Sequence, residues 1–159
     1  MKIVFTVLSL FLVTAPIHAS ECPHHEQHKA DVNRSSDQAM GFDHTKTTHH
    51  FYLTPEGGMI EAESKNPADT ISQSQIREHF EHITKMFSEG NFELPMLIHA
   101  QVPPGVPVMK RLKFDIEYRT EETKQGGRVR ITTTNKEALS AIHEFLRFQI
   151  QDHKTGDPM

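Results

Sequence analysis

The chain has little of several residue types, and each shortage excludes a class of protein. A single cysteine, Cys22, rules out a framework of disulfides within the chain. The net charge is −4, which argues against the basic surface of a nucleic-acid-binding protein. The longest apolar stretch, residues 3–13, is shorter than the roughly 20 residues that a membrane-spanning helix needs. A length of 159 residues suits one domain with one core.

The motifs of several common enzyme classes are missing as well. The chain contains no glycine-rich phosphate loop, no Gly-x-Ser-x-Gly nucleophile turn and no His-Glu-x-x-His zinc helix. Acidic and imidazole groups adjoin each other at Glu78–His79 and at His143–Glu144, but neighbouring residues on a helix do not face each other. We therefore expect a binding protein rather than an enzyme.

The first residues have the pattern of a targeting segment. Lys2 precedes the apolar stretch, which is followed by Pro16 and the small residue Ala19. This order is typical of a secretory signal peptide, so we predict cleavage after Ala19 and a periplasmic or secreted protein. Residues 20–45 are polar, rich in histidine and without sustained periodicity, which indicates a flexible arm before a single domain at residues 46–159.

Periodicity in residues 46–159 predicts an α+β fold. Residues 47–54 and 59–64 have the composition of strands and flank a Pro-Glu-Gly-Gly turn, as in a β-hairpin. Residues 112–122 and 128–134 repeat that arrangement around a second Gly-Gly pair. Each hairpin precedes a segment with helical apolar spacing, at residues 71–88 and 136–154. We expect an antiparallel sheet of about four strands with both long helices on one face, a ββα unit used twice.

The same periodicity assigns particular side chains to the core or the surface. Phe114 and Tyr118 are expected to face inward from the third strand. On the second long helix, Phe145 lies on the flank of the apolar stripe and Phe148 nearly opposite it, as scattered surface aromatics or as the contact surface of a homodimer. Residues 92–112 contain four prolines, so we expect a loop, and its apolar composition suggests that it lies over the core.

Histidine is the abundant residue, with 12 in the chain, and it points to metal. The arm motif CPHHEQH combines thiolate and imidazole, which are ligands suited to copper or zinc, at Cys22, His24, His25 and His28. In the domain, His49 shares a strand face with Phe51, and His99 lies in the proline-rich segment. The predicted ligands of the domain are His49, His50, His79, His99, His143, Met96 and Met109. Because thioether sulfur selects Cu(I), we predict a soft-metal-binding protein, with copper before zinc.

Two other interpretations of these residues stay open. A histidine beside an apolar stripe is most often a hydrogen-bonded structural residue, and methionine is ordinary core filler. The chain would then bind a small molecule, in a pocket beneath the proline-rich segment with Gly105 as a hinge, and no metal. Alternatively, it would bind a protein partner.

Three stretches also carry a resemblance to a family. These stretches are TTHHFYLT, IREHFEHITKMFSEGNFELPMLIHAQVPPGVPVMKRL and IHEFLRFQIQDHKTGD, and the likeness covers roughly residues 40–157. With them the chain resembles a family of small secreted bacterial proteins that are sometimes labelled aspartate carbamoyltransferase. The chain lacks the Ser-Thr-Arg-Thr phosphate loop of that enzyme, so the resemblance implies secretion and the domain boundaries but assigns no catalytic residue.

Overall fold

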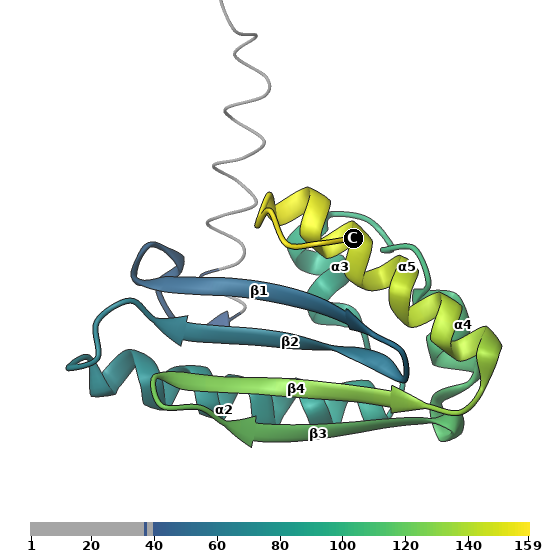
Figure 1. Cartoon of the computed structure of the whole chain (residues 1–159), viewed down its shortest axis with the longest axis horizontal. Coiled ribbons are helices and arrows are strands. Elements are labelled where there is room, and N and C mark those ends of the chain that lie inside the picture. Colours follow the sequence, from purple (N-terminus) through teal and green to yellow (C-terminus); the bar gives the residue numbers. More distant parts are fainter. Residues whose placement is uncertain (1–36, 38–39) are drawn as a thin grey trace, which may run out of the picture.

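A computed structural model describes residue 37 and residues 40–159, and these build one four-stranded antiparallel sheet with helices packed on it (Figure 1). The strands are β1 (Thr47–Thr54), β2 (Gly57–Ser64), β3 (Ile116–Glu122) and β4 (Gly126–Thr133), in the order β1-β2-β4-β3. The helices are α2 (Thr70–Ser88), α3 (Glu93–His99), α4 (Val106–Arg111) and α5 (Lys136–His153), with short 3-10 turns η1 (His44–Lys46) and η2 (Lys113–Asp115). The predicted α+β fold of two hairpins, each followed by a long helix, is confirmed.

The central strands β2 and β4 approach each other closely at two glycines. A Cβ atom on Gly57 would lie 2.1 Å from the carbonyl oxygen of Ile131, and one on Gly126 would lie 2.2 Å from a carbonyl oxygen of β2. Only glycine fits such an approach of two backbones. Ile60 pairs with Val129 midway between these contacts. The register therefore relates the two Gly-Gly hairpins by an approximate two-fold axis through this pair.

Both long helices begin at a capping side chain, and both lie on the same face of the sheet. Asp69 accepts a hydrogen bond from the backbone N–H of Ser72 at 3.0 Å, and Asn135 accepts one from that of Glu137 at 2.9 Å. α2 packs mainly on β3 and β4, whereas α5 packs mainly on β1 and β2. Each helix therefore covers the hairpin of the other half.

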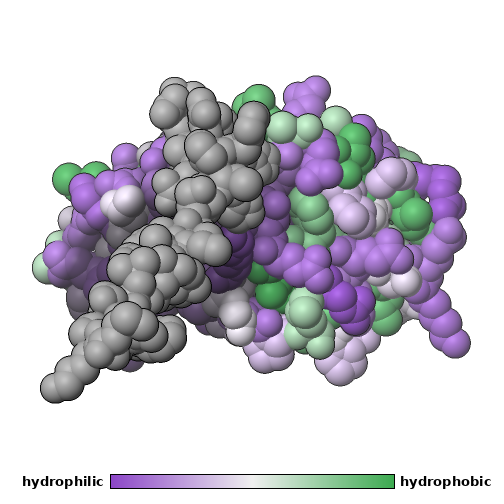
Figure 2. Space-filling view, turned by 90° about the horizontal axis from the view of Figure 1, so that it is seen from above, coloured by the Kyte–Doolittle hydropathy of each residue, from purple (hydrophilic) through white to green (hydrophobic). Residues whose placement is uncertain are grey.

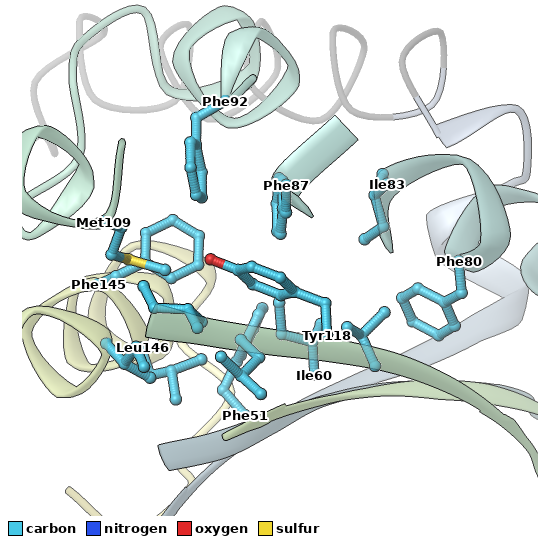
Figure 3. Close-up of a cluster of buried hydrophobic side chains, with 14 of the residues drawn as sticks. Phe51, Ile60, Phe80, Ile83, Phe87, Phe92, Met109, Tyr118, Phe145 and Leu146 are labelled. Carbon is cyan, nitrogen blue, oxygen red and sulfur yellow. The ribbon is translucent and has the colours of Figure 1, made fainter. Parts of the chain in front are cut away.

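Aromatic side chains fill the centre of the core between the sheet and the helices (Figure 3). Phe87 on α2, Phe92 before α3 and Phe145 on α5 meet there. The ring centroids of Phe87 and Phe92 are 4.5 Å apart, and those of Phe87 and Phe145 are 6.2 Å apart. Phe51 of β1 and Ile131 of β4 bury their side chains from the sheet. This cluster joins three helices to the sheet.

The proline-rich segment covers the core, as predicted, but it forms the short helices α3 and α4 rather than a loop. Pro95 on α3 and Met109 on α4 are buried. Gly105 precedes α4 with a φ of +80°, and a Cβ atom there would lie 2.0 Å from the carbonyl oxygen of Ala141 in α5. α4 can therefore touch the backbone of α5 because position 105 has no side chain.

The prediction that Phe114 faces the core from a strand is wrong. β3 begins two residues later, at Ile116, and Phe114 lies in η2 with 91% of its surface exposed. The 3-10 turn rotates the side chain away from the sheet face that Ile116 and Tyr118 share. The ammonium group of Lys113 lies 5.0 Å from the centroid of the Phe114 ring.

The prediction that Phe145 lies on a homodimer surface is also wrong, whereas a homodimer contact through Phe148 stays a prediction. Phe145 is 1% exposed, because α5 packs against helices as well as the sheet and so buries a wider stripe than one face requires. Phe148 packs edge-on against the ring of His99, with centroids 5.0 Å apart. On the side of the molecule seen in Figure 2, apolar residues lie scattered among polar ones.

The packed part of the chain begins before residue 46. Met40 and Phe42, which the sequence analysis places in the arm, are buried in the core. The predicted signal peptide, residues 1–19, lies outside the described residues, as does most of the arm. No helix in the described part of the chain is both long and apolar enough to cross a membrane.

Two glycines provide a test of the packing between α4 and α5. Gly105 and Gly156 both have a positive φ, but nothing lies within 4 Å of a Cβ atom at Gly156. Gly156→Ala should cost only the conformational penalty, about 1–2 kcal/mol. Gly105→Ala should cost clearly more, because the added methyl group collides with backbone. Chemical denaturation measures both, and equal losses of unfolding free energy would contradict this packing.

Candidate functional site

A small cavity lies between the sheet and the two long helices, and α3 closes it. Its volume is about 60 Å³, and its wall is mostly apolar. The polar exceptions are one glutamine and four histidines: Gln149, His49, His79, His99 and His153. Met40 contributes the sulfur atom of the wall. The cavity therefore gathers, in one place, nitrogen and sulfur groups that are far apart in the sequence.

The four histidines come from four different elements. His49 points inward from β1 beside Phe51, because alternate residues of a strand share a face. His79 comes from α2, His99 is the last residue of α3, and His153 is the last residue of α5. The ring centroid of His153 lies 6.2 Å from that of His49 and 5.0 Å from that of His99.

His79 reaches the same region through Phe42. The Phe42 ring stacks on His49 at a centroid distance of 5.6 Å, and it meets the edge of His79 at 5.5 Å. Met40, two residues before Phe42, lines the cavity and also two surface hollows of about 400 Å³ and 630 Å³. His49 and His153 open to the first hollow, and His79 opens to the second. Met40 thus stands where both surface hollows meet the cavity.

Burial holds three of these imidazoles neutral. Burial, together with the nearby His153, lowers the pKa of His49 to about 3. The pKa of His79 falls to about 4, mainly by burial and then by His82. Burial also lowers the pKa of His153 to about 4, with a further contribution from His99 that Asp152 opposes. Each ring therefore keeps a nitrogen lone pair at neutral pH.

These three rings differ from the other buried or half-buried histidines in their hydrogen bonds. The ring nitrogens of His49, His79 and His153 make no hydrogen bond to another residue that the structure describes. His99, in contrast, is bonded at both nitrogens: Nδ1 lies 2.6 Å from Asp152 Oδ2, and Nε2 lies 2.9 Å from Gln149 Oε1. His99 therefore fastens α3 to α5, and the other three rings are available to a ligand.

Two of the predicted ligands have structural partners away from the cavity. His50 points to the opposite face of β1, where Nδ1 lies 2.9 Å from Asp157 Oδ1. His143 donates from Nε2 to the carbonyl oxygens of Thr54 and Gly57 at 2.9 and 3.0 Å, across the first hairpin turn. Both side chains thereby tie segments of the chain together.

The two predicted methionine ligands also lie away from the cavity. Met109 is fully buried in the core on α4, and Met96 is half-buried on α3 without lining the cavity. The arm residues Cys22, His24, His25 and His28 lie outside the described residues. Of the predicted ligands, the structure thus brings His49, His79 and His99 together.

Sequence reasoning missed Met40, Gln149 and His153 as members of this site. Gln149 and His153 are four residues apart, so they continue the buried stripe of α5 that passes through Phe145 and Leu146. That spacing could have identified both. No comparable signal marks Met40, because it lies in a polar stretch, and only the packing of the chain before β1 brings it to the cavity.

One other group of potential ligands occurs at the surface. Among the described residues, the one set of three His, Cys, Asp or Glu ligand atoms within 4.8 Å of one another is Asp37, Asp43 and His44. Its members are half-buried and already share a hydrogen bond, 2.8 Å from His44 Nδ1 to Asp37 Oδ1. In the cavity, by contrast, no three imidazole nitrogens are that close, so a bound ion would draw the rings together by rotation.

The lowered pKa values predict that acid destabilises this protein. A histidine with a folded pKa below its unfolded value of about 6.5 stabilises the fold fully above that pH, and the contribution is lost as pH falls toward the folded pKa. Unfolding free energy should fall between about pH 6.5 and 4, by up to about 1.4 kcal/mol per pH unit for each histidine. Denaturation at several pH values measures this slope.

His153→Phe and His82→Gln provide the comparison for that slope. His82 is exposed on α2, so His82→Gln should leave the slope unchanged, whereas His153→Phe should make it shallower. Equal slopes in the two variants and the wild type would show that His153 is not held neutral by burial.

Comparison of the chain with protein-family models, with curated proteins and with solved structures finds no match. The resemblance to small secreted bacterial proteins therefore stays a prediction, and the function has to be argued from the geometry of the cavity.

Proposed function

We propose that this protein binds one soft metal ion in the cavity, copper(I) before zinc, through His49, His79 and His153 together with Met40. One observation carries the proposal. Three neutral imidazoles without a hydrogen-bond partner among the described residues share one small cavity with a thioether. The three rings are half-buried and also line the surface hollows, so a ligand can reach their nitrogens. A metal ion is such a ligand, because neutral imidazole is a common metal ligand.

The size of the cavity favours an ion over an organic molecule. Its volume is about 60 Å³. Pockets for drug-sized ligands and cofactors measure roughly 300–1,000 Å³. Leu94, Pro95 and Ile98 of α3, in the proline-rich segment, line this cavity. It has room for an ion and a water-sized group, and a small-molecule site in this cavity is the weaker interpretation.

The ligand set favours copper(I) over zinc. Structural zinc sites use four ligands in a tetrahedron, drawn from cysteine, histidine and carboxylates. Among the described residues that line the cavity there is no cysteine and no carboxylate, and the imidazoles are not arranged as a ready tetrahedron. Thioether sulfur is a soft ligand that selects Cu(I). Met40 lines the cavity beside His49, so the wall offers that ligand.

The spacing of two of the rings, His49 and His153, suits a shared ion after small movements, whereas the Phe42 ring contacts both His49 and His79 and would have to shift for His79 to join them. Two imidazoles that each bind one ion at about 2 Å have ring centroids roughly 5–6 Å apart. The centroids of His49 and His153 are 6.2 Å apart. His99 lies at a similar distance from His153, but its two hydrogen bonds already occupy its nitrogens. We therefore assign His99 to the support of the site rather than to the ion.

The predicted arm has a place in this function. The motif CPHHEQH would capture the same ion outside the fold, and the cavity would hold it. The predicted signal peptide would put both in the periplasm or outside the cell. Deleting residues 20–45 would remove Met40 and Phe42 from the core, so the arm is better tested by substitution.

The test is an anaerobic Cu(I) titration against a competing chelator, using the full chain with Cys22→Ser and with His24, His25 and His28 changed to Ser. One equivalent of Cu(I) should still bind. Adding His79→Gln should weaken binding at least tenfold, because an ion loses a ligand, whereas His82→Gln on the exposed side of the same helix should not change it. Zn(II) should bind more weakly than Cu(I).

Three results would contradict the proposal. The first is no binding once the arm ligands are replaced, which would make the arm a scavenging tail. The second is equal affinity in the His79→Gln and His82→Gln variants. The third is unchanged Cu(I) affinity after both His49→Phe and His153→Phe, which would place the ion outside the cavity.

A further inference from the structure

The surface hollow of about 400 Å³ gathers side chains that donate hydrogen bonds. It lies where the start of β1, the residue after β2 and the end of α5 meet. Lys65, Lys154, three threonines and four histidines line it, and none of the described residues in its wall is acidic. The chain as a whole is acidic, with a net charge of −4. A hollow walled by basic and hydroxyl groups favours an anion over a cation.

The two lysines of this hollow have no acidic partner among the described residues. Most other cations of the fold do have one. The paired cations are Lys46, Arg77, Arg111, Arg119, Arg128 and Arg130. Lys65 donates from Nζ to the carbonyl oxygen of Thr45 at 2.9 Å, which leaves two of its three hydrogens. The ammonium groups of Lys65 and Lys154 can therefore bind an anion without first breaking an ion pair in the described part of the chain.

Two carboxylates near the hollow are bonded to histidines of its wall. Asp37 Oδ1 lies 2.8 Å from Nδ1 of His44, and Asp157 Oδ1 lies 2.9 Å from Nδ1 of His50. The second oxygen of Asp157 accepts from the backbone N–H of Phe51 at 2.9 Å. Neither carboxylate lines the hollow itself. Their negative charge is therefore held by donors of the fold and does not fill the space between the lysines.

One of the three threonine hydroxyls keeps its hydrogen for a ligand. Thr155 Oγ1 accepts from the backbone N–H of Asp157 at 3.4 Å, so its O–H can still donate. Thr47 and Thr48 instead donate their hydroxyls to backbone carbonyl oxygens, at 3.3 and 3.5 Å. Thr155 is the residue after Lys154, so these two donors enter the hollow from the same end of α5.

Lys154 occupies its place at a conformational cost. It is one of two non-glycine residues with a positive φ in the described part of the chain, and its φ is +53°. Helices commonly end on glycine in this left-handed conformation, because glycine avoids the clash of a Cβ atom. Strained backbone of this kind is found preferentially at binding sites. A lysine in a glycine position, beside a hollow that needs its charge, fits such a site.

The composition and size of the hollow indicate the class of anion. Lysine binds phosphate as a point charge, whereas flat carboxylates are typically recognised by the fork of an arginine, and no arginine lines the hollow. Its volume of about 400 Å³ lies in the range of organic-ligand pockets, roughly 300–1,000 Å³. We propose that this hollow binds a small organic phosphate, with Lys65, Lys154 and Thr155 holding the phosphate group. None of these three residues is a proposed ligand of the metal ion, so this site does not depend on the proposed function.

Calorimetric titration of the metal-free full chain at low ionic strength tests the proposal. The four arm ligands are replaced by serine, so that the arm histidines do not contribute, and glycerol 3-phosphate is the probe. It should bind with a Kd of about 1 mM or tighter. Inorganic phosphate and the dicarboxylate succinate should bind more weakly, glycerol should not bind, and added salt should weaken binding because exposed charges are screened.

Four variants separate the charge of the lysines from the stability of the fold. Lys65→Ala and Lys154→Ala should each weaken binding by about tenfold, the loss of one charge-assisted hydrogen bond. Lys136→Ala should not change it, because this exposed lysine starts α5 at the end away from the hollow. Lys154→Gly should weaken binding as much as Lys154→Ala and yet raise the midpoint of thermal unfolding, since glycine relieves the positive φ.

Absence of glycerol 3-phosphate binding would overturn the proposal, as would equal affinities in Lys154→Ala and Lys136→Ala. Succinate binding as tightly as glycerol 3-phosphate would refute the assignment to phosphate, and inorganic phosphate binding as tightly would refute the assignment to an organic phosphate. The Cu(I) titration is a separate measurement, and its failure would refute the proposed function while leaving this site standing.

Discussion

The packing of Phe87, Phe92 and Phe145 against one another is the interaction on which the rest of the structure depends. It fixes α2, α3 and α5 at the centre of the core. Each of these phenylalanines has a cavity histidine seven or eight residues away along the same helix, which is about two helical turns. The pairs are Phe87 with His79, Phe92 with His99, and Phe145 with His153. The same contact that closes the core therefore brings three histidines from distant parts of the chain to one cavity, where β1 adds His49.

Burial in this position decides the chemistry of the rings. In an apolar wall the charged form of imidazole is disfavoured, so the rings stay neutral and keep a lone pair. Histidines with a partner have a different role: His50 holds the C-terminal tail, His143 holds the first hairpin turn and His99 holds α3. The cavity histidines His49, His79 and His153 therefore differ from the structural histidines in that their ring nitrogens have no hydrogen-bond partner among the described residues. We propose a soft ion for the unpartnered ones because Met40, a thioether, lines the same cavity.

Much of the fold could be predicted from local signals, because each strand and each long helix is determined by residues that are close together in the sequence. Alternation identified the strands, helical spacing identified α2 and α5, and Asp69 and Asn135 marked their starts. The candidate site was harder, because it depends on which elements meet. His49 was placed on a core-facing strand surface correctly, yet the position of Met40 follows from tertiary packing alone. Phe145 was misplaced because the pattern of one helix does not say how many neighbours that helix has, and Phe114 was misplaced because the 3-10 turn before β3 interrupts the alternation.

Copper K-edge X-ray absorption of the Cu(I)-loaded full chain, with the four arm ligands replaced by serine, tests the central claim most directly. The account predicts scattering from three imidazole nitrogens and one sulfur atom, with the sulfur lost in Met40→Leu and retained in Met86→Leu, a methionine of α2 that does not line the cavity. A spectrum without imidazole scattering, or one in which Met40→Leu and Met86→Leu are indistinguishable, would contradict the assignment of the ion to this cavity.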